Sequence, residues 1–172
     1  MSTQALRRAL TAQRIPPMKE RLRQLLDLRA SILTREATIV AAMKADLGKS
    51  FSESWIEVGG VLSEIDLMVK EAPAWAIADQ VATPMVLWPG KSSILKDPYG
   101  LVLVLAPWNY PFQLSLKPLI GAIAAGNRVV LKPSEMTPTV AKVLETIVTE
   151  SISEGFAMVV QGGAAETQEL LK

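Results

Sequence analysis

The stretch at residues 100–135, "GLVLVLAPWNYPFQLSLKPLIGAIAAGNRVVLKPSE", decides the fold. Its apolar run at 101–105 is unbroken, which is typical of a strand buried on both faces of a sheet. A helical stretch follows from about Leu114 or Pro118 to Ala125, and "NRVVLKP" reads as a second strand. A strand, a helix and a strand in this order predict two parallel strands joined by a crossover helix.

The same alternation continues toward the carboxyl end of the chain. "TPTVAKVLETIVTE" predicts a helix with Thr137 as its cap and Pro138 at its first position. "GFAMVVQGG" predicts a third strand, and "ETQELLK" begins a third helix. The predicted fold class is therefore α/β, with the first half of a Rossmann-like parallel βαβαβ sheet over residues 99–172. Ligands of such sheets bind beyond the carboxyl ends of the strands.

The residues ahead of this region read as helical up to about position 80. Apolar residues recur at steps of three, four and seven from the Pro16-Pro17 pair to "DLGKS", which predicts one helix ending at Gly48. A second helix follows, and Pro73 closes or bends it. We expect residues 1–82 to form a helical region that packs on the sheet.

Residues 83–98 read as a β-hairpin. Two short extended runs, from Met85 to Trp88 and from Ser92 to Lys96, flank a Pro-Gly pair. Two strands alone are marginal in water, so we expect them to pair with something else. The chain offers no obvious third antiparallel strand.

The composition excludes several classes of chemistry. The 172 residues contain no cysteine and no histidine, so a disulfide, a cysteine nucleophile and a serine–histidine arrangement are impossible within this chain. The carboxylates form no cluster suited to a metal ion. The apolar runs are far shorter than the roughly 20 residues of a spanning helix, and the N-terminus has no secretory apolar block. We therefore expect a cytoplasmic protein with no membrane span and no metal site.

Charge is unevenly divided along the chain. Residues 1–50 hold 10 Lys or Arg against 4 Asp or Glu, a net of +6, and the remainder holds 8 against 13, a net of −5. This division favours a basic N-terminal face that docks on an acidic surface of the same protein or of a partner. We expect no nucleic-acid partner, because the basic residues lack interleaved aromatic residues. The arginines at positions 7, 8 and 14, with no acidic residue before Glu20, faintly suggest a transit peptide, but we favour an ordinary basic helix.

Rigid and polar residues gather where the first predicted strand ends, at Pro107, Trp108, Asn109 and Tyr110. Two prolines and two large rings restrict the backbone around Asn109, so its amide is held at low conformational cost. A fixed amide N–H is the kind of donor that stabilises a developing oxyanion. The alternative is that Asn109 caps a turn and that the aromatic rings fill the core.

Lys132, Pro133, Ser134 and Glu135 follow the second strand. Lys132 can donate to hydroxyl or phosphate groups, and Glu135 can accept from a ribose hydroxyl as the acidic residue of dinucleotide folds does. The alternative is a solvated ion pair at a helix entrance, with Glu135 favoured by the helix dipole. No G-x-G-x-x-G follows a strand, and both "GKS" triplets lack the earlier glycine of a P-loop, so they read as caps or turns.

Together these residues resemble the signature of the aldehyde dehydrogenase superfamily. P-W-N-Y-P, G-A-I-A-A-G-N and V-V-L-K-P-S-E occur jointly at the family's spacing, and "ADLGKSFSESWIEVGGVLSEID" and "GGAAETQELL" are similar to its class-3-like branch. The similarity runs from about Arg14 to Lys172. It implies that residues 83–98 form the hairpin of the oligomerisation region and that residues 99–172 form the first half of the NAD(P)-binding domain.

The resemblance implies NAD(P)+-dependent oxidation of an aldehyde to a carboxylate. Asn109 would stabilise the oxyanion formed when a cysteine attacks the aldehyde carbon. Lys132 and Glu135 would bind the adenosine ribose, which favours NAD+ and leaves NADP+ open. The resemblance also assigns Ala106, Pro107, Trp108 and Ser134 to the cofactor and Tyr110 to the substrate pocket.

The sequence departs from the family pattern in what it lacks. It contains no cysteine to act as the nucleophile, and the later general-base glutamate and the glycine-containing pyrophosphate turn are missing. We therefore expect an N-terminal fragment of an aldehyde dehydrogenase, inactive alone, whose full-length form is a homodimer. The alternative is a non-catalytic remnant or interaction module that associates with a longer aldehyde dehydrogenase chain.

Overall fold

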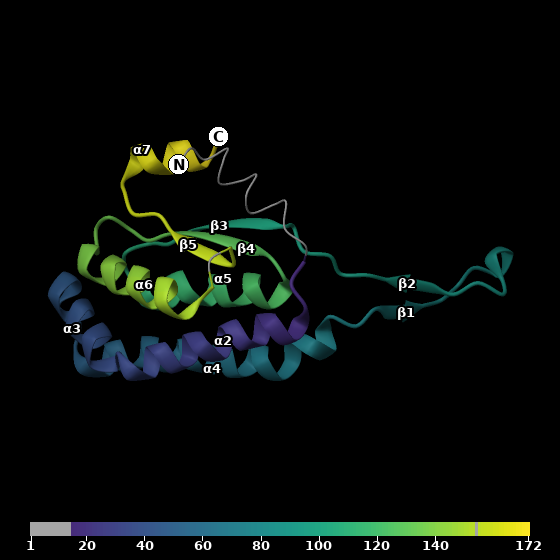
Figure 1. Cartoon of the computed structure of the whole chain (residues 1–172), viewed down its shortest axis with the longest axis horizontal. Helices are drawn as coiled ribbons and strands as arrows, with labels where there is room; N and C mark the ends of the chain where they lie inside the picture. The colour runs from purple at the N-terminus through teal and green to yellow at the C-terminus, as the bar shows by residue number, and fades with distance from the viewer. Residues whose placement is uncertain (1–14, 154) are drawn as a thin grey trace.

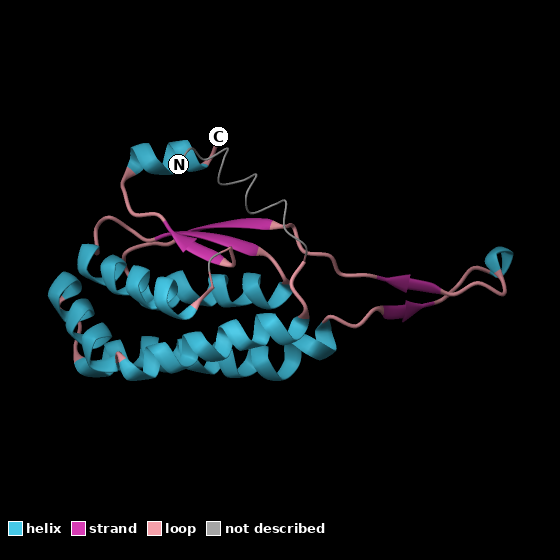
Figure 2. Cartoon of the chain, in the orientation of Figure 1, coloured by secondary structure: helices cyan, strands magenta, loops and turns pink. Residues whose placement is uncertain are grey.

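The computed structural model describes residues 15–153 and 155–172, so the arginines at positions 7, 8 and 14 lie outside the described residues. The chain is built in layers (Figure 1). The N-terminal helices pack against two crossover helices, which cover one face of a parallel sheet, and a short helix near the carboxyl end of the chain lies on the other face. A two-stranded arm projects from this body (Figure 2). The predicted α/β class is confirmed.

The predicted single N-terminal helix is in fact two helices, α2 (Met18–Thr34) and α3 (Glu36–Leu47). They meet at Arg35, whose φ of −116° and ψ of 12° depart from helical values. Side chains compete with the helix backbone here, because the Thr34 hydroxyl donates to the Ser31 carbonyl at 3.0 Å and the Arg35 guanidinium donates to the same carbonyl at 3.4 Å. The apolar spacing continues through the break, so periodicity alone could not reveal it.

Helix α4 (Phe51–Trp75) begins at a capping box. The Ser50 hydroxyl accepts from the Glu53 N–H at 3.3 Å, and the Glu53 carboxylate accepts from the Ser50 N–H at 2.9 Å. Gly48 ends α3 in the left-handed conformation, with a φ of 67°. The first "GKS" triplet is therefore a helix end followed by a helix start, as predicted. Pro73 lies within the last turn of α4.

The arm consists of β1 (Asp79–Val81) and β2 (Ser92–Ile94), which pair antiparallel with each other and with no further strand of the described chain. The predicted hairpin is present, but its first strand is wrong, because Met85–Leu87 is a 3₁₀ turn and β1 precedes residue 83. The pairing ends where the Ser92 N–H donates to the Thr83 hydroxyl at 2.9 Å. The next residue, Pro84, has no N–H and so cannot extend the ladder between β1 and β2.

The main sheet contains β3 (Leu101–Leu105), β4 (Arg128–Lys132) and β5 (Ala157–Val159), in that order and all parallel. Every residue of the central strand β4 is buried. The prediction that residues 101–105 are buried on both faces is wrong, because β3 lies at the edge of the sheet and only Val104 within it is buried. An edge strand has a neighbouring strand on one side only, which leaves most of the side chains of β3 open to solvent on the other side.

Helices α5 (Pro111–Ala125) and α6 (Pro138–Ser151) connect the strands, and the short α7 (Ala164–Leu170) follows β5. Helix α5 begins earlier than the predicted start at Leu114 or Pro118. Pro111 takes the first helical position, where a missing N–H leaves no bond unmade.

Thr137 occupies the predicted cap position of α6 but does not cap it. Its hydroxyl donates to the Ser134 carbonyl at 3.4 Å. The Val140 N–H in the first turn of α6 donates instead to the Asp46 carboxylate of α3, at 2.9 Å. The cap is supplied by a residue far away in the sequence, which local pattern reading cannot detect.

Ion pairs tie the basic N-terminal segment to later acidic residues. The pairs are Arg29 with Asp66, Arg35 with Glu150, and Lys49 with Glu57. Among the described residues, the basic N-terminal segment therefore pairs with acidic residues of this same chain, while the docking of a basic face on an acidic surface stays a prediction. In the described part of the chain, every helix is too short or too polar to cross a membrane, and no three acidic side chains gather closely enough to hold a metal ion.

Candidate functional site

Three loops leave the parallel sheet at the carboxyl ends of its strands, and these ends lie together because β3, β4 and β5 all run in one direction. The Ala106 N–H donates to the Lys132 carbonyl at 3.0 Å, and the Val160 N–H donates to the Leu131 carbonyl at 2.9 Å. These bonds continue the ladder to the last residue of β4. The loop after β3 and the turn after β4, which carry the predicted site residues, therefore begin side by side.

Lys132 is the last residue of β4, and only 5% of its surface is exposed. Its ammonium group donates to the Glu135 carboxylate at 2.8 Å and to the Pro133 carbonyl at 3.2 Å. The hydrogen bond from Lys132, aided by a backbone hydrogen bond and by the lysine charge, lowers the pKa of Glu135 below its ordinary value. Glu135 is thus an exposed, ionised acceptor. The alternative of a solvated pair does not describe Lys132, which is buried.

Ser134 is buried in the turn between these two residues. Its hydroxyl accepts from the Met136 N–H at 3.2 Å, and its carbonyl accepts from the Thr137 N–H at 3.3 Å. The described contacts of Ser134 therefore shape the turn that leads into α6. A contact between Ser134 and a cofactor stays a prediction.

Glu166, which sequence reasoning missed, reaches the same edge from the start of α7. Its carboxylate accepts from the Gly163 N–H at 2.7 Å. Backbone hydrogen bonds lower the pKa of Glu166, and the charge of Lys132 lowers it further. Gly162 has a φ of +146°, and a Cβ there would lie 2.4 Å from Glu166 Cγ. The paired glycines three and four residues before a glutamate were the available signal.

Asn109 lies in the loop after β3 with its side chain exposed. Among the described residues, that side chain makes no hydrogen bond. Tyr110, and not Asn109, occupies the cap position of α5, and Tyr110 makes no side-chain cap bond. Trp108 and Tyr110 are each about half exposed, at 49% and 52%. The alternative of a capping asparagine with core-filling rings therefore does not describe this loop.

Lys49 and Glu57, which sequence reasoning also missed, hold the main chain of this loop. The Lys49 ammonium group donates to the Asn109 carbonyl at 2.8 Å and lies 4.3 Å from the centre of the Tyr110 ring. It also pairs with the Glu57 carboxylate, whose second oxygen accepts from the Gln113 N–H at 3.1 Å. Glu57 is fully buried. Its position on the apolar stripe of α4, between Ser54 and Val58, was the signal that could have revealed it.

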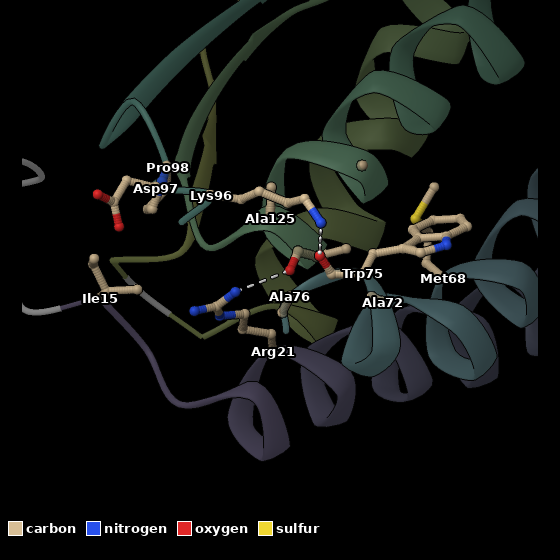
Figure 3. A pocket seen from close by; sticks show the side chains of 12 residues that line it. Ile15, Arg21, Met68, Ala72, Trp75, Ala76, Lys96, Asp97, Pro98 and Ala125 are labelled. Atoms are coloured by element: carbon tan, nitrogen blue, oxygen red, sulfur yellow. Dashed lines mark hydrogen bonds between the residues drawn. The ribbon is translucent and has the colours of Figure 1, made fainter. Parts of the chain in front are cut away.

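A pocket of about 400 Å³ lies away from these residues (Figure 3). It is formed by the ends of α4 and α5 and by the segment ahead of β3. Its two cationic side chains already have partners, because Arg21 donates to the Ala124 carbonyl at 3.1 Å and Lys96 donates to the Trp75 carbonyl at 3.0 Å. No predicted site residue lines it, so the pocket and the candidate site are separate.

Comparison with known proteins gives a consistent result. The model of the aldehyde dehydrogenase family matches residues 2–172. The 4,4'-diaponeurosporen-aldehyde dehydrogenase of Staphylococcus aureus is 45% identical over 152 residues, which cover 88% of this chain and 33% of that protein. Aldehyde dehydrogenase family 3 member A2 of Pongo abelii is 41% identical over 173 residues, which cover 100% of this chain and 36% of that protein.

The structural comparison agrees with the sequence comparison. A solved structure of Staphylococcus aureus AldH in its substrate-bound state has a TM-score of 0.93 at 40% identity, covering 99% of this chain and 39% of that chain. The described fold is therefore the amino-terminal part of the fold of these proteins. The chain spans about a third of the length of the curated relatives it matches.

Proposed function

The chain belongs to the aldehyde dehydrogenase family, and we propose that it supplies the amino-terminal part of an enzyme that oxidises an aldehyde to a carboxylate with NAD(P)+. The observation that carries this proposal is the loop after β3. Its main chain is anchored through the Asn109 carbonyl, while the Asn109 amide stays exposed and makes no hydrogen bond to another described residue. An amide that is fixed in place and unengaged is suited to act on a reacting group.

Asn109 would donate its amide N–H to the oxyanion that forms on the aldehyde oxygen when a nucleophile adds to the carbonyl carbon. One such donor typically stabilises the transition state by about 3–4 kcal/mol. The exposed Tyr110 ring beside it would border the aldehyde. The 172 residues contain no cysteine, so the nucleophile has to come from outside these residues.

The residues at the ends of β3 and β4 fit a dinucleotide. Glu135 is an ionised acceptor for ribose hydroxyls, and the buried Lys132 orients it while retaining one N–H donor for the same sugar. The remaining contacts would come from Ala106, Pro107, Trp108 and Ser134. When bound, NAD(P)+ supplies the acceptor of the hydride. We expect NAD+ to bind more tightly than NADP+, because the Glu135 carboxylate repels a 2′-phosphate.

A second candidate function is association with a longer aldehyde dehydrogenase chain, and the arm favours it. Large apolar side chains cover the arm while remaining exposed: Val81, Met85, Val86, Leu87, Trp88, Ile94 and Leu95. Exposed apolar surface of this extent marks an interaction site in soluble proteins. We propose that the arm, which includes most of residues 83–98, contacts a second copy or a longer chain.

The first experiment is the intact mass of the protein purified from its source, followed by an assay of aldehyde-dependent NADH formation. Activity in the native protein that falls about 10²–10³-fold in Asn109→Ala supports the proposed reaction. Gln168→Ala, an exposed position on α7, is the control and should leave the rate unchanged. Full activity in Asn109→Ala would overturn the role of this residue. A native mass of 18.6 kDa without activity, together with co-purification of a longer chain, would favour the second candidate.

A further inference from the structure

We infer that the Lys49–Glu57 ion pair positions Asn109, by fixing the main chain at Asn109 itself and at the start of the helix that follows it. The inference deepens the proposed function, because it concerns the residue proposed to hold the oxyanion. Lys49 and Glu57 would act through Asn109 and are therefore positioning residues. The pair comes from the N-terminal helical layer, whereas the loop belongs to the sheet.

The Lys49 side of the pair fixes the loop at Asn109 itself. The ammonium group reaches the Asn109 carbonyl at 2.8 Å and lies over the Tyr110 ring at 4.3 Å from its centre. A hydrogen bond to the carbonyl and a cation above the neighbouring ring restrain two consecutive residues. A change of the main chain at Asn109 that re-aims its side chain would therefore break both contacts.

The Glu57 side of the pair fixes the loop where it becomes α5. The Glu57 carboxylate accepts from the Gln113 N–H at 3.1 Å. This N–H belongs to the first turn of α5, where backbone donors have no partner within the helix. Tyr110 makes no cap bond with its side chain, so Glu57 of a different helix supplies the cap. One ion pair thus joins Asn109 to the start of the helix that follows it.

The burial of the pair separates it from ordinary surface ion pairs. The Lys49 side chain is 12% exposed and that of Glu57 is 0% exposed, so salt screens this interaction little. Lys117 and Glu64 also join α5 to α4, but they lie 4.0 Å apart and are 34% and 23% exposed. That pair joins α5 to α4 and has no printed contact with the loop after β3, which makes it a control.

The chain allows a simple spectroscopic test, because it contains only two asparagines, Asn109 and Asn127. Nitrogen-15 labelling of asparagine in the full chain gives backbone and side-chain amide signals from these two residues alone. Asn127 is buried at the opposite edge of the sheet, where its side chain accepts from the Gly100 N–H at 3.0 Å and donates to the Ala122 carbonyl at 3.2 Å. The amide signals of Asn127 therefore show whether the fold is intact.

The test variant is the double substitution Lys49→Met with Glu57→Gln. Removing one partner alone would leave a buried charge without compensation, whereas removing both avoids this and keeps an acceptor for Gln113. We expect the Asn109 signals to shift and those of Asn127 to stay in place. The single variant Lys49→Arg keeps a cation near the Asn109 carbonyl. Its Asn109 signals should therefore lie closer to the wild-type positions than those of the double variant. Lys117→Met should move neither set.

Three outcomes would overturn the inference. One is that the Asn109 signals of the double variant coincide with those of the wild type. Another is that the signals of both asparagines move together, which would make the pair a general stabiliser of the fold. The third is an equal shift in Lys117→Met. None of these readouts needs enzyme activity, so a failed aldehyde assay would leave the positioning result standing, and a failed positioning result would leave the assay standing.

Discussion

The Asp46 carboxylate accepts a hydrogen bond from the Val140 backbone N–H at 2.9 Å, across 94 positions of the sequence. Asp46 lies near the end of α3, and Val140 lies in the first turn of α6. Glu57 has the same relationship to Gln113 at the start of α5. Both crossover helices are therefore capped by carboxylates of the N-terminal helical layer. Both caps lie at the carboxyl ends of the strands, where the candidate site also lies.

Asp46→Ala should lower the free energy of unfolding by about 1 kcal/mol, the usual cost of removing a helix cap. Asp46→Asn should lose less, because its amide oxygen can still accept from Val140. Urea denaturation followed by tryptophan fluorescence measures both. Asp27→Ala is the control, since Asp27 takes part only in an exposed pair with Arg23 at 3.5 Å. Equal losses in Asp27→Ala and Asp46→Ala would contradict the cap.

Two glycines should respond to alanine in opposite directions. Gly126 has a φ of +98°, and a Cβ there would lie 2.7 Å from the Arg21 guanidinium carbon. Gly126→Ala should cost about 1–2 kcal/mol for its backbone conformation alone, and more because Arg21 has to move. Gly59 lies in α4 with open space around its Cβ position, so Gly59→Ala should stabilise by about 0.5–1 kcal/mol. Thermal unfolding measures both effects. A midpoint temperature that shifts in the same direction in both variants would contradict this prediction.

Glu135 should make stability depend on pH in a defined direction. Its pKa in the folded chain lies below its usual value of 4.5 because Lys132 donates to it. Folding therefore favours the ionised carboxylate, so its contribution is present above about pH 4.5 and is lost as the pH falls through the lowered pKa. Urea denaturation should show wild type more stable than Glu135→Gln at pH 7 and the difference vanishing in acid. With Lys132→Met as the background, Glu135→Gln should show much less of this pH dependence.

The arm should govern association. Replacing Met85, Val86 and Trp88 together by serine removes exposed apolar surface without touching the core. We expect sedimentation velocity to show less self-association, or less binding to a longer aldehyde dehydrogenase chain, with an unchanged circular dichroism spectrum. Leu26→Ser removes an exposed apolar side chain of α2 and is the control. An unchanged distribution of species in the arm variant would remove the support for the second candidate function.

The regular elements were predictable because their signals are local. The strands at 101–105 and 128–132 follow from short runs of branched residues, and the end of α3 follows from Gly48. The break at Arg35 escaped detection, since the side chains of Thr34 and Arg35 compete with the backbone without disturbing the apolar spacing. The edge position of β3 was not predicted, because the sequence of a strand does not show which strands lie beside it in the sheet.

The candidate site was predictable only in part for the same reason. Asn109, Lys132 and Glu135 stand at strand ends, where polar residues signal a binding edge. Lys49 and Glu57 act over 60 and 56 positions of the sequence. No local pattern relates a lysine ahead of α4 to a carbonyl in the loop after β3, because β1 and β2 lie between them in the sequence. The contacts that hold the site were thus harder to predict than the residues that form it.

The order of these contacts along the chain has a consequence for synthesis. Asp46 and Glu57 are translated before the helices that they cap, by 94 and 56 residues. A ribosome making this chain therefore releases the helical layer first, with both carboxylates in place, before α5 and α6 emerge. The carboxylates that cap α5 and α6 are therefore already synthesised when each of these helices emerges.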